Sequence, residues 1–200
     1  MTALAQPPPP VSQAATITSD EFFAMIEAGI FERRPVFLWD GGIYERMSKS
    51  VLHAATATLI QDALMRRLPS GWCSWAENPL QVSAKYAPLP DLMIVRGSPR
   101  DYLTTKLHPT PADVGLLIEI AVTRLPKDLE TGAKLWAAAG VARYWVADVP
   151  GRRMVSHHGP GLHEGVGRYA HVESYAIGET LPLVLDGSEV DQIPVEELLP

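Results

Sequence analysis

Two carboxylates stand alone inside apolar segments of the chain. The segment "PLPDLMIV" (residues 88–95) contains Asp91, and the segment "GLLIEIAV" (residues 115–122) contains Glu119. A carboxylate in such a run is costly to bury unless it is paired or binds a cation. If the two segments form neighbouring strands, both carboxylates can converge on one hard cation, and oxygen ligands suit Mg²⁺ or Mn²⁺. An ion held there can polarise a phosphodiester and activate a water molecule.

A structural interpretation of the same carboxylates is equally open at this point. Asp91 can cap a loop, and Glu119 can pair with an arginine such as Arg124 or Arg143. An aspartate and a glutamate that lie far apart in the sequence do not by their chemistry alone decide between a metal site and an ion pair.

The elements that must position these carboxylates follow from the apolar spacing. Helical spacing predicts helices at 18–29, 48–68 and 125–140, and the best of them has its apolar positions at Val51, Leu52, Ala55, Leu59, Ala63 and Leu64. Turn signals predict a hairpin at 35–47 around Asp40-Gly41-Gly42 and a loop at 97–113. Continuous aliphatic runs predict buried strands at 113–122 and 141–148, the second with a hairpin partner at 152–158.

These elements together predict a mixed central β-sheet flanked by helices, an α/β or α+β architecture. The remaining C-terminal sequence supplies two or three short strands and a closing helical turn. The length of 200 residues predicts a single domain over residues 18–200, with its core at about 36–158, after a Pro-rich N-terminal arm over residues 1–17.

Composition excludes several classes of protein. The net charge of −6 argues against a protein that coats nucleic acid non-specifically, although it allows phosphates to be gripped locally. No apolar run is long enough to span a membrane, and a single cysteine fits a cytoplasmic protein. Neither Gly-rich phosphate-loop pattern occurs, so we expect no nucleotide cofactor.

Four segments in order carry a resemblance to a known family. They are "DGGIYERMS" with His53 on the following helix, "LPDLMIV", "LLIEIA" and "KDLETGAKLWAAAGVARYWVAD". Over residues 36–158 the chain resembles the Uma-two family of restriction endonucleases, in the PD-(D/E)XK nuclease superfamily. The last segment is the most specific, and the residues in register are Asp128, Trp136, Gly140, Val141, Tyr144, Trp145 and Asp148.

The resemblance implies a restriction-endonuclease-like core, commonly dimeric, with Mg²⁺ or Mn²⁺ held by the carboxylates that match Asp91 and Glu119. Glu45 matches an upstream acidic position that can bind a water of the metal shell, and its alternative is a solvent-facing hairpin residue. His53 matches a position near the site, where it can contact a phosphate or simply pack.

The catalytic lysine is the point at which the chain departs from the pattern. The superfamily places a lysine two residues beyond the glutamate, where this chain has Ala121, and the family supplies it from the next helix, where this chain has Gly132. Lys134 is the nearest substitute on that helix, but two helical positions rotate a side chain by roughly 200°, toward solvent. Lys127, Lys85 and Arg124 stay open as sources of the cation.

Two functions follow as hypotheses. The first is a Mg²⁺-dependent endonuclease that hydrolyses DNA phosphodiester bonds, with Asp91, Glu119, Glu45 and Lys134 as its candidate catalytic residues, acting as a homodimer in the cytoplasm. The second is a nuclease-fold protein that has lost catalysis and serves as a nucleic-acid-binding or partner-binding module.

Overall fold

The computed structural model describes residues 15–32, 34–123 and 125–200, and for residues 125–129 it describes the backbone alone. Most of the predicted arm over residues 1–17 therefore lies outside the described residues, as do Arg124 and the side chains of Lys127 and Asp128. None of the helices in the described ranges is long and apolar enough to cross a lipid bilayer.

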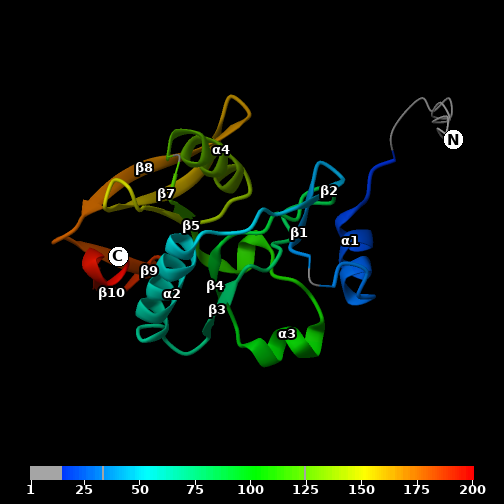
Figure 1. The fold of residues 1–200 in the computed structure, drawn as a ribbon, viewed down its shortest axis with the longest axis horizontal. Coiled ribbons are helices and arrows are strands. Elements are labelled where there is room, and N and C mark those ends of the chain that lie inside the picture. The colour runs from blue at the N-terminus through cyan, green and yellow to red at the C-terminus, as the bar shows by residue number, and fades with distance from the viewer. Residues whose placement is uncertain (1–14, 33, 124) are drawn as a thin grey trace, which may run out of the picture.

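A six-stranded mixed sheet forms the centre of the molecule (Figure 1). Its order is β3-β4-β5-β6-β7-β8, and its strands are β3 (Trp72–Ala76), β4 (Leu92–Arg96), β5 (Val114–Ala121), β6 (Arg143–Asp148), β7 (Arg153–His163) and β8 (Val166–Ala176). Only the central pair β5–β6 is parallel, and the other pairs are antiparallel. The predicted mixed sheet is confirmed, and so is the hairpin that follows β6.

Helix α2 (Val51–Met65) covers one face of the sheet and helix α4 (Leu125–Ala138) covers the other (Figure 1). Residues of β5 alternate between the two faces, as strand geometry requires. Ile118 and Ile120 pack in the core cluster that contains Ile60 of α2, whereas Leu117 packs in the cluster that contains Trp136 of α4. The same alternation directs Glu119 to the α4 face.

Smaller elements surround this sheet. Helix α1 (Ser19–Glu27) packs with the hairpin β1 (Val36–Trp39) and β2 (Gly42–Glu45) in a third cluster, while the hairpin β9 (Thr180–Leu185) and β10 (Ser188–Pro194) packs on the α2 side. The short 3₁₀ helices are η1 (Pro111–Asp113) and η2 (Val195–Glu197). The predicted first hairpin is confirmed: Asp40 and Gly41 have φ of 48° and 73°, the positive values that a type I′ turn requires.

The prediction of a loop at 97–113 is wrong. Helix α3 (Pro99–Thr105) and η1 both lie within this range. Pro99 opens α3 at a position that needs no backbone N–H, and the side chain of Asp101 accepts the N–H of Ser98 at 2.7 Å. The Pro- and Thr-rich composition that suggests a loop is here the composition of short capped helices.

The predicted apolar face of α2 is correct only at its C-terminal end, where Ala63 and Leu64 are buried. Val51 is 87% exposed, and Leu52 and Leu59 are exposed as well. The face that packs on the sheet consists of His53, Thr56, Ile60, Ala63 and Leu64. The two polar side chains on this inner face have partners of their own: His53 contacts Asp91, and the Thr56 hydroxyl donates to the Leu52 carbonyl.

Candidate active site

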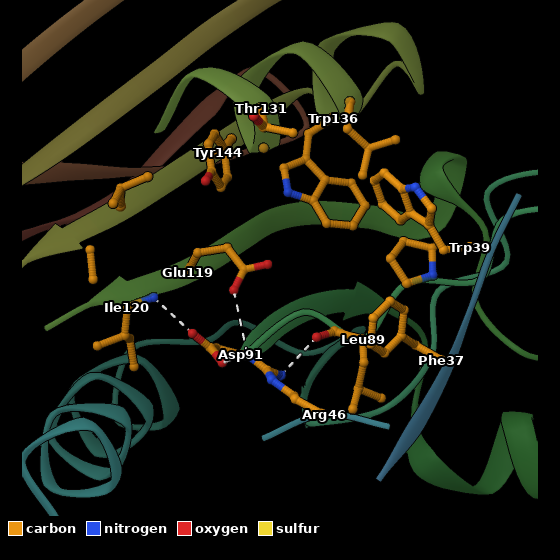
Figure 2. A pocket seen from close by; sticks show the side chains of 15 residues that line it. Phe37, Trp39, Arg46, Leu89, Asp91, Glu119, Ile120, Thr131, Trp136 and Tyr144 are labelled. Atoms are coloured by element: carbon orange, nitrogen blue, oxygen red, sulfur yellow. Dashed lines mark hydrogen bonds and ion pairs between the residues drawn. The ribbon is translucent and has the colours of Figure 1, made fainter. Parts of the chain in front are cut away.

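Asp91 and Glu119 lie opposite each other on neighbouring strands. Strands β4 and β5 are antiparallel, and Leu92 pairs with Ile118, so one further step of the same register places Asp91 across from Glu119. Both residues line a cavity of about 420 Å³ between the β1–β2 hairpin and α4, which we call the carboxylate pocket (Figure 2). Its aromatic wall consists of Phe37, Trp39, Trp136 and Tyr144.

The Asp91 carboxylate is buried, with its side chain 2% exposed, and each of its oxygens has two partners. Oδ1 forms ion pairs with Arg46 and with Lys49 Nζ, the latter at 2.9 Å. Oδ2 accepts the Ile120 N–H at 2.8 Å and lies 3.0 Å from His53 Nε2. These contacts compensate the burial of the charge.

The two carboxyl groups have pKa values that are shifted in opposite directions. Burial acts to raise the pKa of Asp91, but the hydrogen bond from His53 and the charge of Arg46 outweigh it and hold that pKa well below its usual range. Burial raises the pKa of Glu119 well above its usual range, and the neighbouring Asp91 charge adds to the shift. Two carboxyl groups that share one site commonly separate in this way.

Arg46 is the site residue that the sequence reasoning missed. Its Nη1 donates to the Leu89 carbonyl at 2.7 Å, and its Nη2 pairs with Asp91 and lies 3.9 Å from Glu119 Oε2 (Figure 2). It directly follows Glu45, the last residue of β2. Alternation along β2 gave no signal for Arg46, because the consecutive residues Tyr44 and Glu45 are both exposed.

The structure does not bring Glu45 or Lys134 into the carboxylate pocket. Glu45 pairs with Arg34 at 2.8 Å, and both side chains are at least half exposed. Lys134 lies 4.0 Å from Glu130 on the exposed side of α4. Among the described side chains, the arginine beside Glu119 is Arg46.

Gly132 and Ala121, which occupy the two lysine positions of the resemblance, both line the carboxylate pocket. A Cβ atom on Gly132 would lie 2.9 Å from the Tyr144 hydroxyl oxygen, closer than carbon and oxygen normally approach. Tyr144 is buried, so it has little room to withdraw. A lysine at position 132 therefore requires a change at Tyr144.

The pocket offers two carboxylates to a hard divalent cation, which would have to displace protein partners from Asp91, because both of its oxygens are already paired. Asp91 and Glu119 supply two carboxylates, and Arg46 lies where one positive group contacts both. Mg²⁺ typically binds through one or two carboxylates, with water in its other positions. Within the described ranges no three His, Cys, Asp or Glu side chains are grouped so that they could hold a metal, which argues against a cage built wholly from protein ligands.

Comparisons with known proteins show the family and the fold of this chain. A family model, Uma2, described as "Putative restriction endonuclease", matches residues 20–195. A solved structure from Anabaena variabilis ATCC 29413, described as a putative nuclease belonging to DUF820, is 14% identical with a TM-score of 0.59, over 91% of this chain and 97% of that chain. At this identity the likeness shows a shared fold. A search of curated proteins finds no match.

Proposed function

The chain belongs to the Uma2 family of restriction endonucleases, and on that premise we propose that it is a Mg²⁺-dependent endonuclease that hydrolyses DNA phosphodiester bonds. One observation carries the proposal. Asp91 and Glu119 lie opposite each other on neighbouring strands, in one pocket, and the Arg46 guanidinium pairs with Asp91 and lies 3.9 Å from Glu119. Paired carboxylates of this kind suit a hard cation that acts on a phosphate.

In this proposal Asp91 and Glu119 would hold Mg²⁺ or Mn²⁺. The bound ion would supply Lewis-acid polarisation of the phosphate and an acidified water. His53 and the Ile120 N–H fix Oδ2 of Asp91 and hold this carboxylate in one orientation. Glu119 is less constrained, since its side chain is 27% exposed and its contact with Arg46 is long, at 3.9 Å.

The proposal is tested by nicking of supercoiled plasmid DNA in Mg²⁺ or Mn²⁺. We expect Glu119→Gln and Asp91→Asn to lose roughly 100-fold or more in rate, because each replaces a carboxyl group that would bind the ion with an amide. Asp186→Asn is the matched control, since Asp186 is half exposed and pairs with Arg96 away from the pocket. Wild-type activity in both pocket variants would reject the assigned site.

A binding module without catalysis is the second candidate, and the partners of Asp91 favour it. Both Asp91 oxygens are fully used by protein groups, so the site is electrostatically complete without an added ion. This candidate predicts no Mn²⁺ binding by calorimetry, no nicking, and a DNA gel shift that is unchanged in Glu119→Gln. RNA fragments in the same gel shift distinguish the two nucleic acids.

We also propose a homodimer, because β3 and β8 are the edge strands of the sheet and carry free edges in the described fold. Sedimentation velocity tests the homodimer, and a monomer at all concentrations would reject it.

A cytoplasmic location remains our proposal, since the chain has only one cysteine, Cys73.

A further inference from the structure

We propose that Arg46 is the catalytic cation of this site and contacts the scissile phosphate in place of the lysine that the chain lacks at positions 121 and 132. The inference rests on the proposed function and deepens it. Arg46 and the divalent cation also compete for the same two carboxyl groups, those of Asp91 and Glu119.

Arg46 is placed where such a cation must act. It lines the carboxylate pocket together with both acids, and its side chain is 23% exposed, so a ligand in the pocket can reach it. The Leu89 carbonyl anchors one guanidinium nitrogen at 2.7 Å, which leaves the other end directed at the carboxylates (Figure 2). A guanidinium carries five N–H donors in a planar fork that matches the oxygens of a phosphate.

The other basic groups near Asp91 are positioning residues. Lys49 Nζ is held between Asp91 and Glu77, and its side chain is only 17% exposed. Lys49 is not among the residues that line the carboxylate pocket. His53 is buried beneath Asp91, with its Nε2 directed at that carboxylate. Both hold Asp91 in place without lining the carboxylate pocket, whereas Arg46 lines it.

Hydrolysis of a phosphodiester is accelerated by a positive charge that is fixed beside the phosphate. Water forms a bond from its oxygen to phosphorus and releases one proton to solvent, while one bridging P–O bond breaks and its oxygen takes up a proton. The products are a phosphomonoester and a hydroxyl group, and no electrons are transferred. In the transition state, negative charge develops on the non-bridging oxygens of the phosphate, and a preorganised hydrogen-bond donor stabilises this charge. A guanidinium supplies this positive charge through N–H donors and accepts no hydrogen bond.

The same geometry predicts that Arg46 opposes metal binding. Its Nη2 atom contacts Asp91 and lies 3.9 Å from Glu119. A divalent cation bound to the same carboxylates would lie close to this guanidinium, and the two positive charges would repel each other. Removal of Arg46 should therefore tighten the binding of a divalent cation and slow cleavage at the same time. A residue that only supports the fold would weaken both, so opposite signs are the diagnostic result.

The experiment compares wild type, Arg46→Ala and Arg46→Lys by calorimetric titration with Mn²⁺ and by plasmid nicking at saturating Mn²⁺. We expect Arg46→Ala to bind Mn²⁺ about 3- to 10-fold more tightly and to cleave roughly 100-fold more slowly. Arg46→Lys keeps the charge and the pair with Asp91, so it controls for folding, and we expect intermediate cleavage. Arg96→Ala is the matched control, an exposed arginine paired with Asp186.

Two results would overturn the inference. Nicking by Arg46→Ala at the wild-type rate, with Glu119→Gln inactive, would remove Arg46 from the reaction and leave the proposed endonuclease intact. Unchanged or weaker Mn²⁺ binding in Arg46→Ala, with Arg46→Lys folded, would exclude the competition even if the wild type cleaves no DNA.

Discussion

The guanidinium of Arg46 forms an ion pair with the Asp91 carboxylate, across 45 positions of the chain. The pair joins the end of the β1–β2 hairpin to the residue that precedes β4. A buried carboxylate without a partner costs several kcal/mol, so this contact supports the fold as well as the site. Stability and function are therefore coupled at Asp91 and can be separated only by comparing it with Glu119.

The first prediction is that the two pocket carboxylates differ in their contribution to stability. Asp91→Asn should lower the free energy of unfolding by about 2–4 kcal/mol, because Arg46 and Lys49 lose their charged partner. Glu119→Gln should change it by less than about 1 kcal/mol, because burial and the Asp91 charge already disfavour ionised Glu119. Urea unfolding at pH 7.5 measures both.

Equal losses in the two variants would contradict this assignment. Asp186→Asn again serves as the control, because a half-exposed ion pair contributes little. If the prediction is correct, Glu119→Gln is the cleaner variant for activity measurements, since its loss of cleavage does not include a loss of folded protein.

The second prediction concerns the space at Gly132. Gly132→Lys alone should destabilise the protein by about 1–3 kcal/mol, because its Cβ would lie 2.9 Å from the Tyr144 hydroxyl. Combined with Tyr144→Phe, which removes that oxygen, the new lysine can enter the carboxylate pocket. We expect this double substitution to restore nicking to the Arg46→Ala variant by at least about tenfold.

The matched control for the rescue is Gly132→Met with Tyr144→Phe in the same Arg46→Ala background. Methionine gives a comparable side-chain length without a charge, so it should fill the space and restore nothing. Equal rescue by methionine and lysine would show that packing of α4, and not positive charge, limits the Arg46→Ala variant.

The central strands and the two carboxylates could be predicted from sequence because their signal is local. The aliphatic run around Glu119 indicates a strand buried on both faces, and alternation along it determines which residues share a face with the carboxylate. The rotation of α2 could not be predicted in this way. Its inward face carries His53 and Thr56, whose burial depends on partners that hydropathy does not register.

Arg46 could not be predicted because its role depends on contacts with distant segments. Its neighbours in sequence are Glu45 and Met47, and the local pattern does not show which of these three side chains faces the sheet. The partners that fix Arg46 are the Leu89 carbonyl and Asp91, which come from the segment before β4. Arg46 therefore reaches the pocket only through the packing of the hairpin against that segment.

The third prediction is a pH dependence of stability that originates in His157. This side chain is buried, its Nδ1 lies 3.2 Å from the Tyr144 carbonyl, and burial lowers its pKa, with the hydrogen bond to that carbonyl as a partial offset. Below its ordinary pKa of 6.5 the unfolded chain therefore takes up a proton before the folded one. Stability should fall as the pH decreases from 6.5 to the lower folded pKa.

Urea unfolding at pH 7.5 and pH 5.5 measures this effect. His157→Asn keeps an N–H donor but does not titrate, so it should lose less stability on acidification than the wild type. The difference between the two proteins should be at most about 1.4 kcal/mol per pH unit, the limit for one proton. His163→Asn, in the exposed end of the same strand, should behave like wild type. Identical pH profiles for wild type and His157→Asn would exclude His157 as the source.

The fourth prediction tests whether the position of α4 depends on a glycine in β8. A Cβ atom on Gly167 would lie 2.1 Å from the Lys134 carbonyl oxygen and 2.4 Å from the Ala138 nitrogen, both in the helix backbone. A backbone cannot rotate away as a side chain can, so Gly167→Ala must shift α4. We expect a loss of about 1–3 kcal/mol in stability, measured by urea unfolding.

The shift should also reach the carboxylate pocket, because α4 carries Gly132 and Trp136 of its wall. Gly161→Ala is the matched control: Gly161 lies in the neighbouring strand β7, and a Cβ there meets nothing within 4 Å. It should change stability by less than about 0.5 kcal/mol and leave Mn²⁺ binding at its wild-type value. If Gly167→Ala matched Gly161→Ala in both measurements, the close contact between β8 and α4 would not determine where the pocket wall lies.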